Sequence, residues 1–115
     1  MIKGHISKND AGVVYRYVTI NSQILLPEES WKIYKHTTDP DDWCNWGYAG
    51  SGPAQLALAI MLRFCRKEEA VSIYQAFKFD VIAKLPGDRD FAIPNERVHN
   101  WLISMRAKAQ KGSDL

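Results

Sequence analysis

The sequence predicts an α+β domain in which an antiparallel sheet of three or four strands packs against three helices. The first third of the chain is rich in β-branched and aromatic residues, with the alternation expected of half-buried strands. The remainder carries apolar residues at helical spacing, and one stretch of it, residues 53–65, is almost wholly apolar. A helix that is apolar on every side has to be surrounded by the rest of its domain, so we expect this helix to be central.

The expected strands lie at the start of the chain and are separated by turn-forming residues. They span residues 2–7, 13–20 and 23–26. Pro27 ends the third strand, because proline has no N–H group to donate to a neighbouring strand. Residues 91–93, with the sequence Phe-Ala-Ile, are expected to add a short fourth strand at an edge of the sheet.

Three helices are expected in the rest of the chain. They span residues 53–65, 68–85 and 94–110. The second and third each show a single apolar stripe, and the second stops at Pro86-Gly87. Residues 28–36 fit either a short helix or an irregular crossing, and residues 37–45 are expected to form a loop. Residues 1–110 then make one domain, followed by a flexible tail at 111–115.

Composition is typical of a folded domain that stays out of the membrane. Of the 115 residues, 46% are hydrophobic and 24% charged, and the net charge of +2 is too small to indicate nucleic-acid binding by itself. No segment resembles a signal peptide or a membrane span. Cys44 and Cys65 lack the spacing of metal ligands and are expected to be reduced thiols. We expect a cytoplasmic protein that is a monomer or a homodimer.

The glycine-rich segment that begins the central helix is the main candidate for a binding site. Successive backbone N–H groups at the start of a helix can bind an anion, and Trp46 or Tyr48 could stack a base or a sugar above it. No Gly-Lys-Ser/Thr follows, and the spacing differs from G-x-G-x-x-G, so neither common phosphate-binding motif is present. The candidate ligand-binding residues are Trp46, Gly47, Tyr48, Gly50, Ser51, Gly52 and Gln55.

A purely structural interpretation of the same segment is favoured over the ligand-binding one. Glycines permit a tight turn with positive φ, and Trp46 and Tyr48 can cover the core. Ser51 is expected to cap the helix, and Gln55 can reach back to the cap. Gly50-Ser51-Gly52 lacks the full G-x-S-x-G pattern of a nucleophile elbow.

The last helix carries a weaker candidate for nucleic-acid binding. Its polar residues fall close to i, i+3, i+4 spacing and share one face: Arg97, Asn100, Ser104, Lys108 and Lys111. The basic residues among them, Arg97, Lys108 and Lys111, could lie against phosphates. An ordinary solvated face is the favoured interpretation.

Two further groups of side chains suggest little chemistry. The run Asp39-Pro40-Asp41-Asp42 could attract a hard cation, although Pro40 indicates an exposed turn. The histidines lie in three separate regions, and no two titratable groups are placed as an acid/base pair. We therefore predict no catalytic residue, no metal site and no cofactor, and an enzyme is the least favoured class.

Residues 46–57, Trp-Gly-Tyr-Ala-Gly-Ser-Gly-Pro-Ala-Gln-Leu-Ala, resemble a family of small proteins known only as a domain of unknown function. The shared string is W-G-Y-x-G-S-G-P-A-Q-L-A, and residues 74–78, 81–85 and 101–102 support it. The resemblance covers residues 36–102, and the acidic residues between 37 and 45 depart from it. It implies a stand-alone accessory protein of bacterial genomes and of mobile or viral elements, with no activity, cofactor or catalytic residue to carry over.

These observations favour a small non-enzymatic binding module that acts through another macromolecule. A protein is preferred over a nucleic acid as its partner. The alternative is a protein that binds a small anionic or nucleotide ligand at the glycine-rich segment 46–55.

Overall fold

The computed structural model describes residues 1–37, 39 and 42–113, and it has the α+β fold predicted from the sequence. Its strands are β1 (Ile2–Lys8), β2 (Val14–Ile20), β3 (Gln23–Ile24) and β4 (Phe91–Ile93). Its α-helices are α1 (Glu28–Trp31), α2 (Ser51–Phe64), α3 (Lys67–Asp80) and α4 (Asn95–Ser113). A short 3-10 helix, η1 (Ile82–Lys84), follows α3.

The four strands form one antiparallel sheet in the order β3-β2-β1-β4. The late strand β4 lies at an edge, as predicted, and pairs with β1 through Ile2 opposite Ile93 and Gly4 opposite Phe91. Gly4 is required at this point because a Cβ atom there would lie 2.0 Å from the Phe91 ring. The missing side chain lets the Phe91 ring lie over the strand and reach Trp46, with which it makes an edge-on contact.

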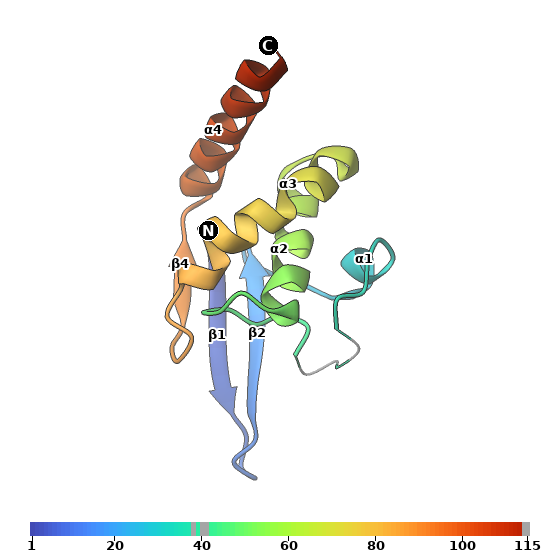
Figure 1. The fold of residues 1–115 in the computed structure, drawn as a ribbon. Helices are drawn as coiled ribbons and strands as arrows, with labels where there is room; N and C mark the ends of the chain where they lie inside the picture. The colour runs from blue at the N-terminus through green and yellow to red at the C-terminus, as the bar shows by residue number, and fades with distance from the viewer. Residues whose placement is uncertain (38, 40–41, 114–115) are drawn as a thin grey trace.

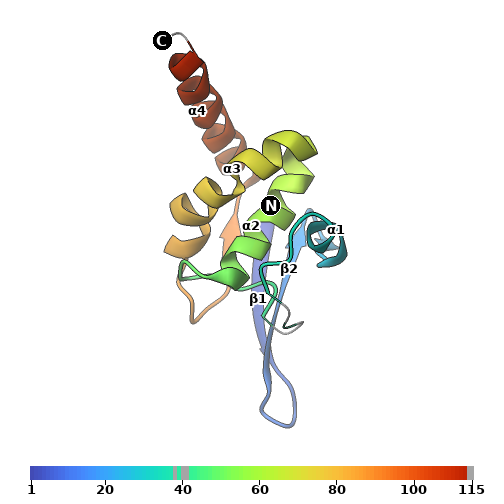
Figure 2. The same ribbon diagram turned by 45° about the vertical axis from the view of Figure 1, so that its right-hand side comes forward.

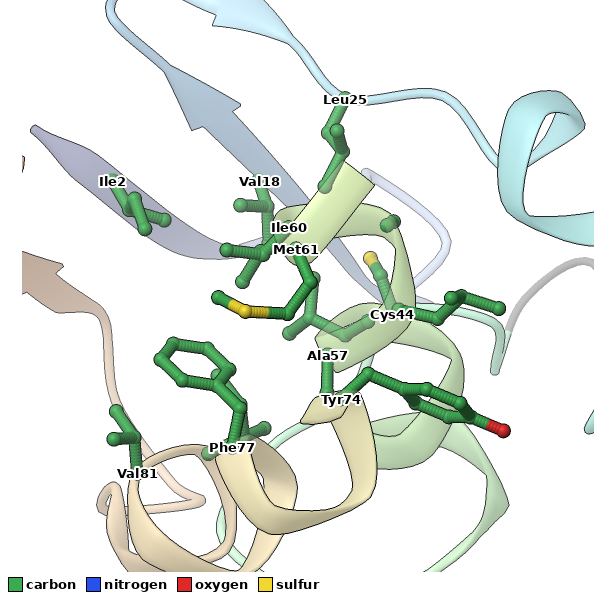
Figure 3. Close-up of a cluster of buried hydrophobic side chains, with 14 of the residues drawn as sticks. Ile2, Val18, Leu25, Cys44, Ala57, Ile60, Met61, Tyr74, Phe77 and Val81 are labelled. Carbon is green, nitrogen blue, oxygen red and sulfur yellow. The ribbon is translucent and has the colours of Figure 1, made fainter. Parts of the chain in front are cut away.

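Helix α2 is the centre of the fold, as its composition predicts. Every residue from Gly52 to Met61 is buried, and Leu56 and Ile60 are fully so. Figure 3 shows why: α2 side chains such as Met61 lie between strand residues on one side and Phe77 of α3 on the other. Each face of the helix is therefore covered by a different element.

The predicted second helix was too long. Helix α3 ends at Asp80 rather than at residue 85, and Val81 leaves helical geometry with φ −124° and ψ −61°. Val81 and Ile82 are both buried, although consecutive residues on one helix point about 100° apart. The break turns both side chains into the core, and the chain continues as η1.

Other boundaries differ by a few residues. The third strand ends at Ile24 instead of residue 26, because Leu25 turns into the core while its N–H group still bonds Val18. Residues 28–36, for which the sequence fitted either a short helix or an irregular crossing, begin with the short helix α1 and continue irregularly. Helix α4 starts one residue after Pro94 and runs to Ser113, so it enters the expected tail, whose residues 114–115 lie outside the described part.

All four helices leave one face of the sheet uncovered (Figures 1 and 2). Side chains alternate along a strand, so this open face consists of the residues that point away from α2. They are Lys3, His5, Ser7, Tyr15, Tyr17, Thr19, Ile24 and Ala92, and none of them is buried. The far half of the β1–β2 hairpin and the far half of α4 project from opposite ends, which gives dimensions of 57 × 26 × 24 Å.

Candidate functional site

The ring of Trp46 is part of the core rather than a surface for stacking a ligand. It is 1% exposed, and its Nε1 donates to the carbonyl oxygens of Pro86 and Arg89 at 3.1 and 3.2 Å. These bonds satisfy the one polar atom of the indole ring inside the protein. The contacts of Trp46 therefore favour a structural role in the core over ligand binding.

Gly47 has the positive φ, +89°, that the structural interpretation expected of this segment. A Cβ atom here would lie 2.4 Å from the Cα of Gly87, so two backbone segments meet where neither has a side chain. The N–H group of Gly47 donates to the carbonyl of Ile82 at 3.0 Å. Gly47 thereby fastens the segment before α2 to the turn after α3.

The start of α2 is closed by packing rather than left open. Gly50 is the N-cap residue and Ser51 is the exposed first residue of the helix, so the expected cap by the Ser51 side chain is wrong by one position. A Cβ atom on Gly50 would meet the Tyr48 ring at 2.4 Å, and one on Gly52 would meet the carbonyl oxygen of Asp42 at 2.6 Å. The two glycines therefore allow the preceding loop to fold onto the helix.

Tyr48 and Asp42 give the same corner a polar character. The Asp42 carboxylate accepts a hydrogen bond from Asn45 Nδ2 at 2.8 Å. Burial, and then the nearby charge of Asp42, raise the pKa of the Tyr48 phenol. Tyr48 is still 45% exposed, so it does not cover the core as expected. An anion bound at the start of α2 would have to approach the negative charge of Asp42.

Gln55 connects α2 to the irregular segment after α1, and its expected bond to the helix cap is wrong. The side chain is fully buried, and its Oε1 accepts from the N–H group of His36 at 2.8 Å. Its Nε2 donates to Ser30 Oγ at 2.9 Å and to the carbonyl of Tyr34 at 3.0 Å. A buried amide is stable in an apolar helix only when such partners are present.

Arg16 is a residue of this region that the sequence analysis did not single out. Its guanidinium lies 4.7 Å from the centre of the Trp46 ring, and its Nη2 donates to the carbonyl of Gly87 at 2.9 Å. Its Nη1 is buried without an acceptor in the described part of the chain. A signal existed, because the alternation of β2 puts Arg16 on the same face as Val18 and Ile20.

The weaker candidate residues remain on the surface. Arg97 and Lys108 are exposed on α4, and neither pairs with an acidic side chain within residues 1–37, 39 and 42–110. The Lys111 side chain lies outside the described part, as do Pro40 and Asp41 of the acidic run. Among the described residues, no three His, Cys, Asp or Glu side chains gather as a metal site would require. Cys44 and Cys65 are both free thiols.

His36 belongs to a small polar cluster on the helical side of the molecule. Its Nε2 lies 2.7 Å from the hydroxyl oxygen of Tyr74, and its ring lies 4.5 Å from that of Tyr34. Burial, and then the positive charge of Lys78, lower the pKa of His36 below its ordinary value of 6.5. The neutral ring is therefore favoured, and its Nε2 is hydrogen-bonded to the Tyr74 hydroxyl.

On the open face, aromatic rings from the two central strands form a row. The rings of His5 and Tyr17 stack with centroids 4.7 Å apart and planes 21° from parallel. Tyr15 continues the row, with its ring 6.5 Å from that of Tyr17 and 25° from parallel. We call these three residues the aromatic row. No sequence motif marks it, although the alternation of both strands places its members on one face.

Together these features define a two-layer α+β domain with a packed helical layer and one open sheet face. The sequence model of the family of unknown function DUF6166 matches residues 4–104, so the chain belongs to that family. The family resemblance drawn from the sequence is thereby confirmed. No curated protein and no solved structure matches the chain. Among the described helices, none has the length and apolar character needed to cross a bilayer.

Replacing Gly47 by alanine tests whether the contact with Gly87 holds the two loops together. Gly47→Ala adds backbone strain at positive φ and a clash with Gly87, so we expect a loss of about 3 kcal/mol or more in the free energy of unfolding. Gly12→Ala is a matched control, because Gly12 has φ +82° and its Cβ atom would lie 3.7 Å from Lys8 Cε, an ordinary van der Waals contact. It should cost about 1 kcal/mol in urea denaturation. Equal losses for the two variants would contradict the proposed close contact.

His36 predicts a pH dependence of stability near its ordinary pKa. Because folding lowers this pKa, the unfolded chain binds the proton more readily, and the free energy of unfolding should rise as pH increases through the region just below 6.5. His36→Asn should remove this part of the dependence in denaturation curves between about pH 5.5 and 7.5. Glu69, whose pKa its bond to Arg106 lowers from 4.5, titrates below this window. An unchanged pH dependence in the variant would rule the assignment out.

Proposed function

We propose that this protein is a small non-enzymatic binding module and that another macromolecule docks on its open face. The observation that carries the proposal is the aromatic row, which lies on the sheet face that no helix covers. In two-layer domains the sheet face away from the helices is normally polar, because nothing shields it from water. Aromatic rings grouped there are a feature of binding surfaces.

Part of the exposed apolar surface lies on this face. Tyr15 and Ile24 are 47% and 54% exposed, and both belong to the open face. Val13, which is 57% exposed, extends the exposed apolar surface toward the tip of the hairpin. A two-stranded hairpin that projects from a domain is only marginally stable by itself, so a docked partner would also stabilise it.

Two of the carboxylates have structural partners. Asp90 accepts from the N–H group of Ile6 at 2.8 Å, and Glu69 holds Arg106 through two bonds of 2.7 and 2.9 Å. These contacts support a binding role. From the family resemblance we also propose that the protein is a cytoplasmic accessory protein of a mobile or viral element.

Site-specific crosslinking tests where the partner docks. A photoreactive benzoylphenylalanine at position 15 or 24 should give an adduct of higher mass in cells, because both side chains face the partner. The same residue at position 79 is the control, since Phe79 is 55% exposed on α3, on the other side of the molecule. Adducts formed from position 79 alone would refute docking on the open face.

One observation favours the alternative, a small anionic ligand. Buried arginines are normally paired with an acceptor for each N–H group, whereas Nη1 of Arg16 has none in the described residues. Arg16 lies next to Trp46 and Gly87, at the segment that the sequence analysis proposed as a ligand site. An anion that reached this guanidinium would supply the missing acceptor.

Thermal denaturation with inorganic phosphate and with ATP tests this alternative. A ligand held by Arg16 should stabilise the protein by about 2.7 kcal/mol at a hundredfold excess over Kd. Arg16→Gln should abolish the shift, and Arg89→Gln, a change at a 70% exposed side chain, should leave it intact. If neither compound raises the melting temperature of the unmodified protein, the small-ligand function is excluded for both.

A further inference from the structure

We infer that the open face binds single-stranded nucleic acid, with bases stacked on the aromatic row and phosphates held by Lys3. This inference rests on the proposed function, because it names the chemistry of the partner for the same surface. It replaces the preference for a protein partner that the sequence suggested. Three properties of the face lead to it: the geometry of the rings, the sign of the charge and the openness of the surface.

The ring geometry suits unpaired bases. His5 and Tyr17 are direct cross-strand partners on β1 and β2, and Tyr15 follows two residues before Tyr17 on the same strand. The His5 ring lies 4.7 Å from the Tyr17 ring across the two strands, and the Tyr15 ring lies 6.5 Å from the Tyr17 ring along β2, with interplanar angles of 21° and 25° for the two pairs. Four-stranded sheets that bind single-stranded RNA also stack two or three bases on aromatic side chains of the sheet.

The charge of the sheet favours an anionic partner. Its strands contain three cations, Lys3, Lys8 and Arg16, and no aspartate or glutamate. Arg16 and Lys8 alternate onto the helical side, whereas Lys3 is exposed on the open face. A second copy of this chain would bring Lys3 of each copy to the same interface without an acidic residue of the strands to pair it. A nucleic acid supplies both the anions and the planar rings.

The negative charge of Asp90 limits where the phosphates of a bound nucleic acid can lie. Its carboxylate lies 3.6 Å from Nδ1 of His5 and accepts from the N–H group of Ile6, so it stands at the β4 side of the row. A phosphate at this edge would be repelled. The strand of nucleic acid should therefore keep its backbone near Lys3 and away from Asp90.

An open sheet also discriminates between single and double strands. In a duplex the bases already stack on one another, so the rings of a flat protein surface can reach only the duplex ends. The basic face of α4 lacks comparable rings, since Trp101 packs against Phe77 and donates to Asp80. Stacking and charge coincide on the open face, and the preference should be for single strands.

Fluorescence anisotropy with purified protein tests the inference. The probes are fluorescein-labelled oligo(U) and oligo(dT) of about 10 nucleotides, the length that one small domain covers, at about 50 mM salt. We expect Tyr15→Ala to weaken binding about tenfold and Tyr15→Phe, which keeps the ring, to bind as the unmodified protein does. Tyr34→Ala is the matched control, because Tyr34 is 59% exposed and lies outside the sheet.

Charge variants test the phosphate path in the same assay. Lys3→Gln should reduce the slope of log affinity against log salt by about 0.7, the contribution of one phosphate contact on a single strand. Asp90→Asn should tighten binding, because it removes the negative charge beside the row. An unlabelled duplex of equal length should compete poorly.

Four results of the anisotropy assay would overturn the inference. They are no change in anisotropy with either probe, an equal loss for Tyr34→Ala, full competition by the duplex, or binding that depends on Arg97 and Lys108 and ignores Tyr15. If adducts from positions 15 and 24 form but survive nuclease and are removed by protease, the partner is a protein. That outcome ends the nucleic-acid inference and leaves the docking surface standing. A purified oligonucleotide that binds through Tyr15 supports both.

Discussion

The fold depends on one constraint, which is that helix α2 is apolar around its whole circumference and cannot face water. Its residues from Gly52 to Met61 are buried by the sheet, by α3 and by the loop that precedes the helix. The hydrophobic free energy of this burial, at about 25 cal/mol per Å² of apolar surface, is available only when all these elements are in place. The glycine-rich segment is therefore best understood as the joint that lets the chain close over the start of α2.

Hydrogen bonds as well as apolar contacts hold this joint together. Trp46 directs its N–H group to two carbonyl oxygens of the loop before β4, and Gly47 bonds the carbonyl of Ile82. On the other side of the helix, Gln55 satisfies three groups of the segment 30–36. Each bond joins segments that are far apart in sequence. The specific string of residues 46–57 thus has a sufficient structural explanation.

The sequence predicted those elements whose residues form a pattern within one short segment of the chain. The apolar run around Ile60 predicted the central helix, and the proline and alternation near residues 13–27 predicted the first strands. Gln55 could not be assigned, because its partners come from the segment 28–36, whose own pattern was ambiguous. The burial of Trp46 depends on carbonyl groups some forty residues later in the chain. Such long-range contacts leave no periodic trace in a single sequence.

The candidate surfaces could also be predicted only in part. Alternation in β1 and β2 predicts that the residues of the aromatic row share one face and that Arg16 lies on the other, but only the sheet register shows that His5 lies beside Tyr17. The pattern that predicts a strand does not say which of its faces the helices will cover. The open face could therefore be recognised only after the helical layer had been placed.

The pairing of β1 with β4 has a consequence for how the protein is made. Ile2 and Ile93 lie opposite each other, so the sheet joins two strands separated by most of the polypeptide. A ribosome releases the hairpin long before it releases β4, and contacts with such a large sequence separation form slowly. Until translation reaches residue 93, the backbone edge of β1 has no strand to pair with. The nascent chain is then a candidate for chaperone binding during that interval.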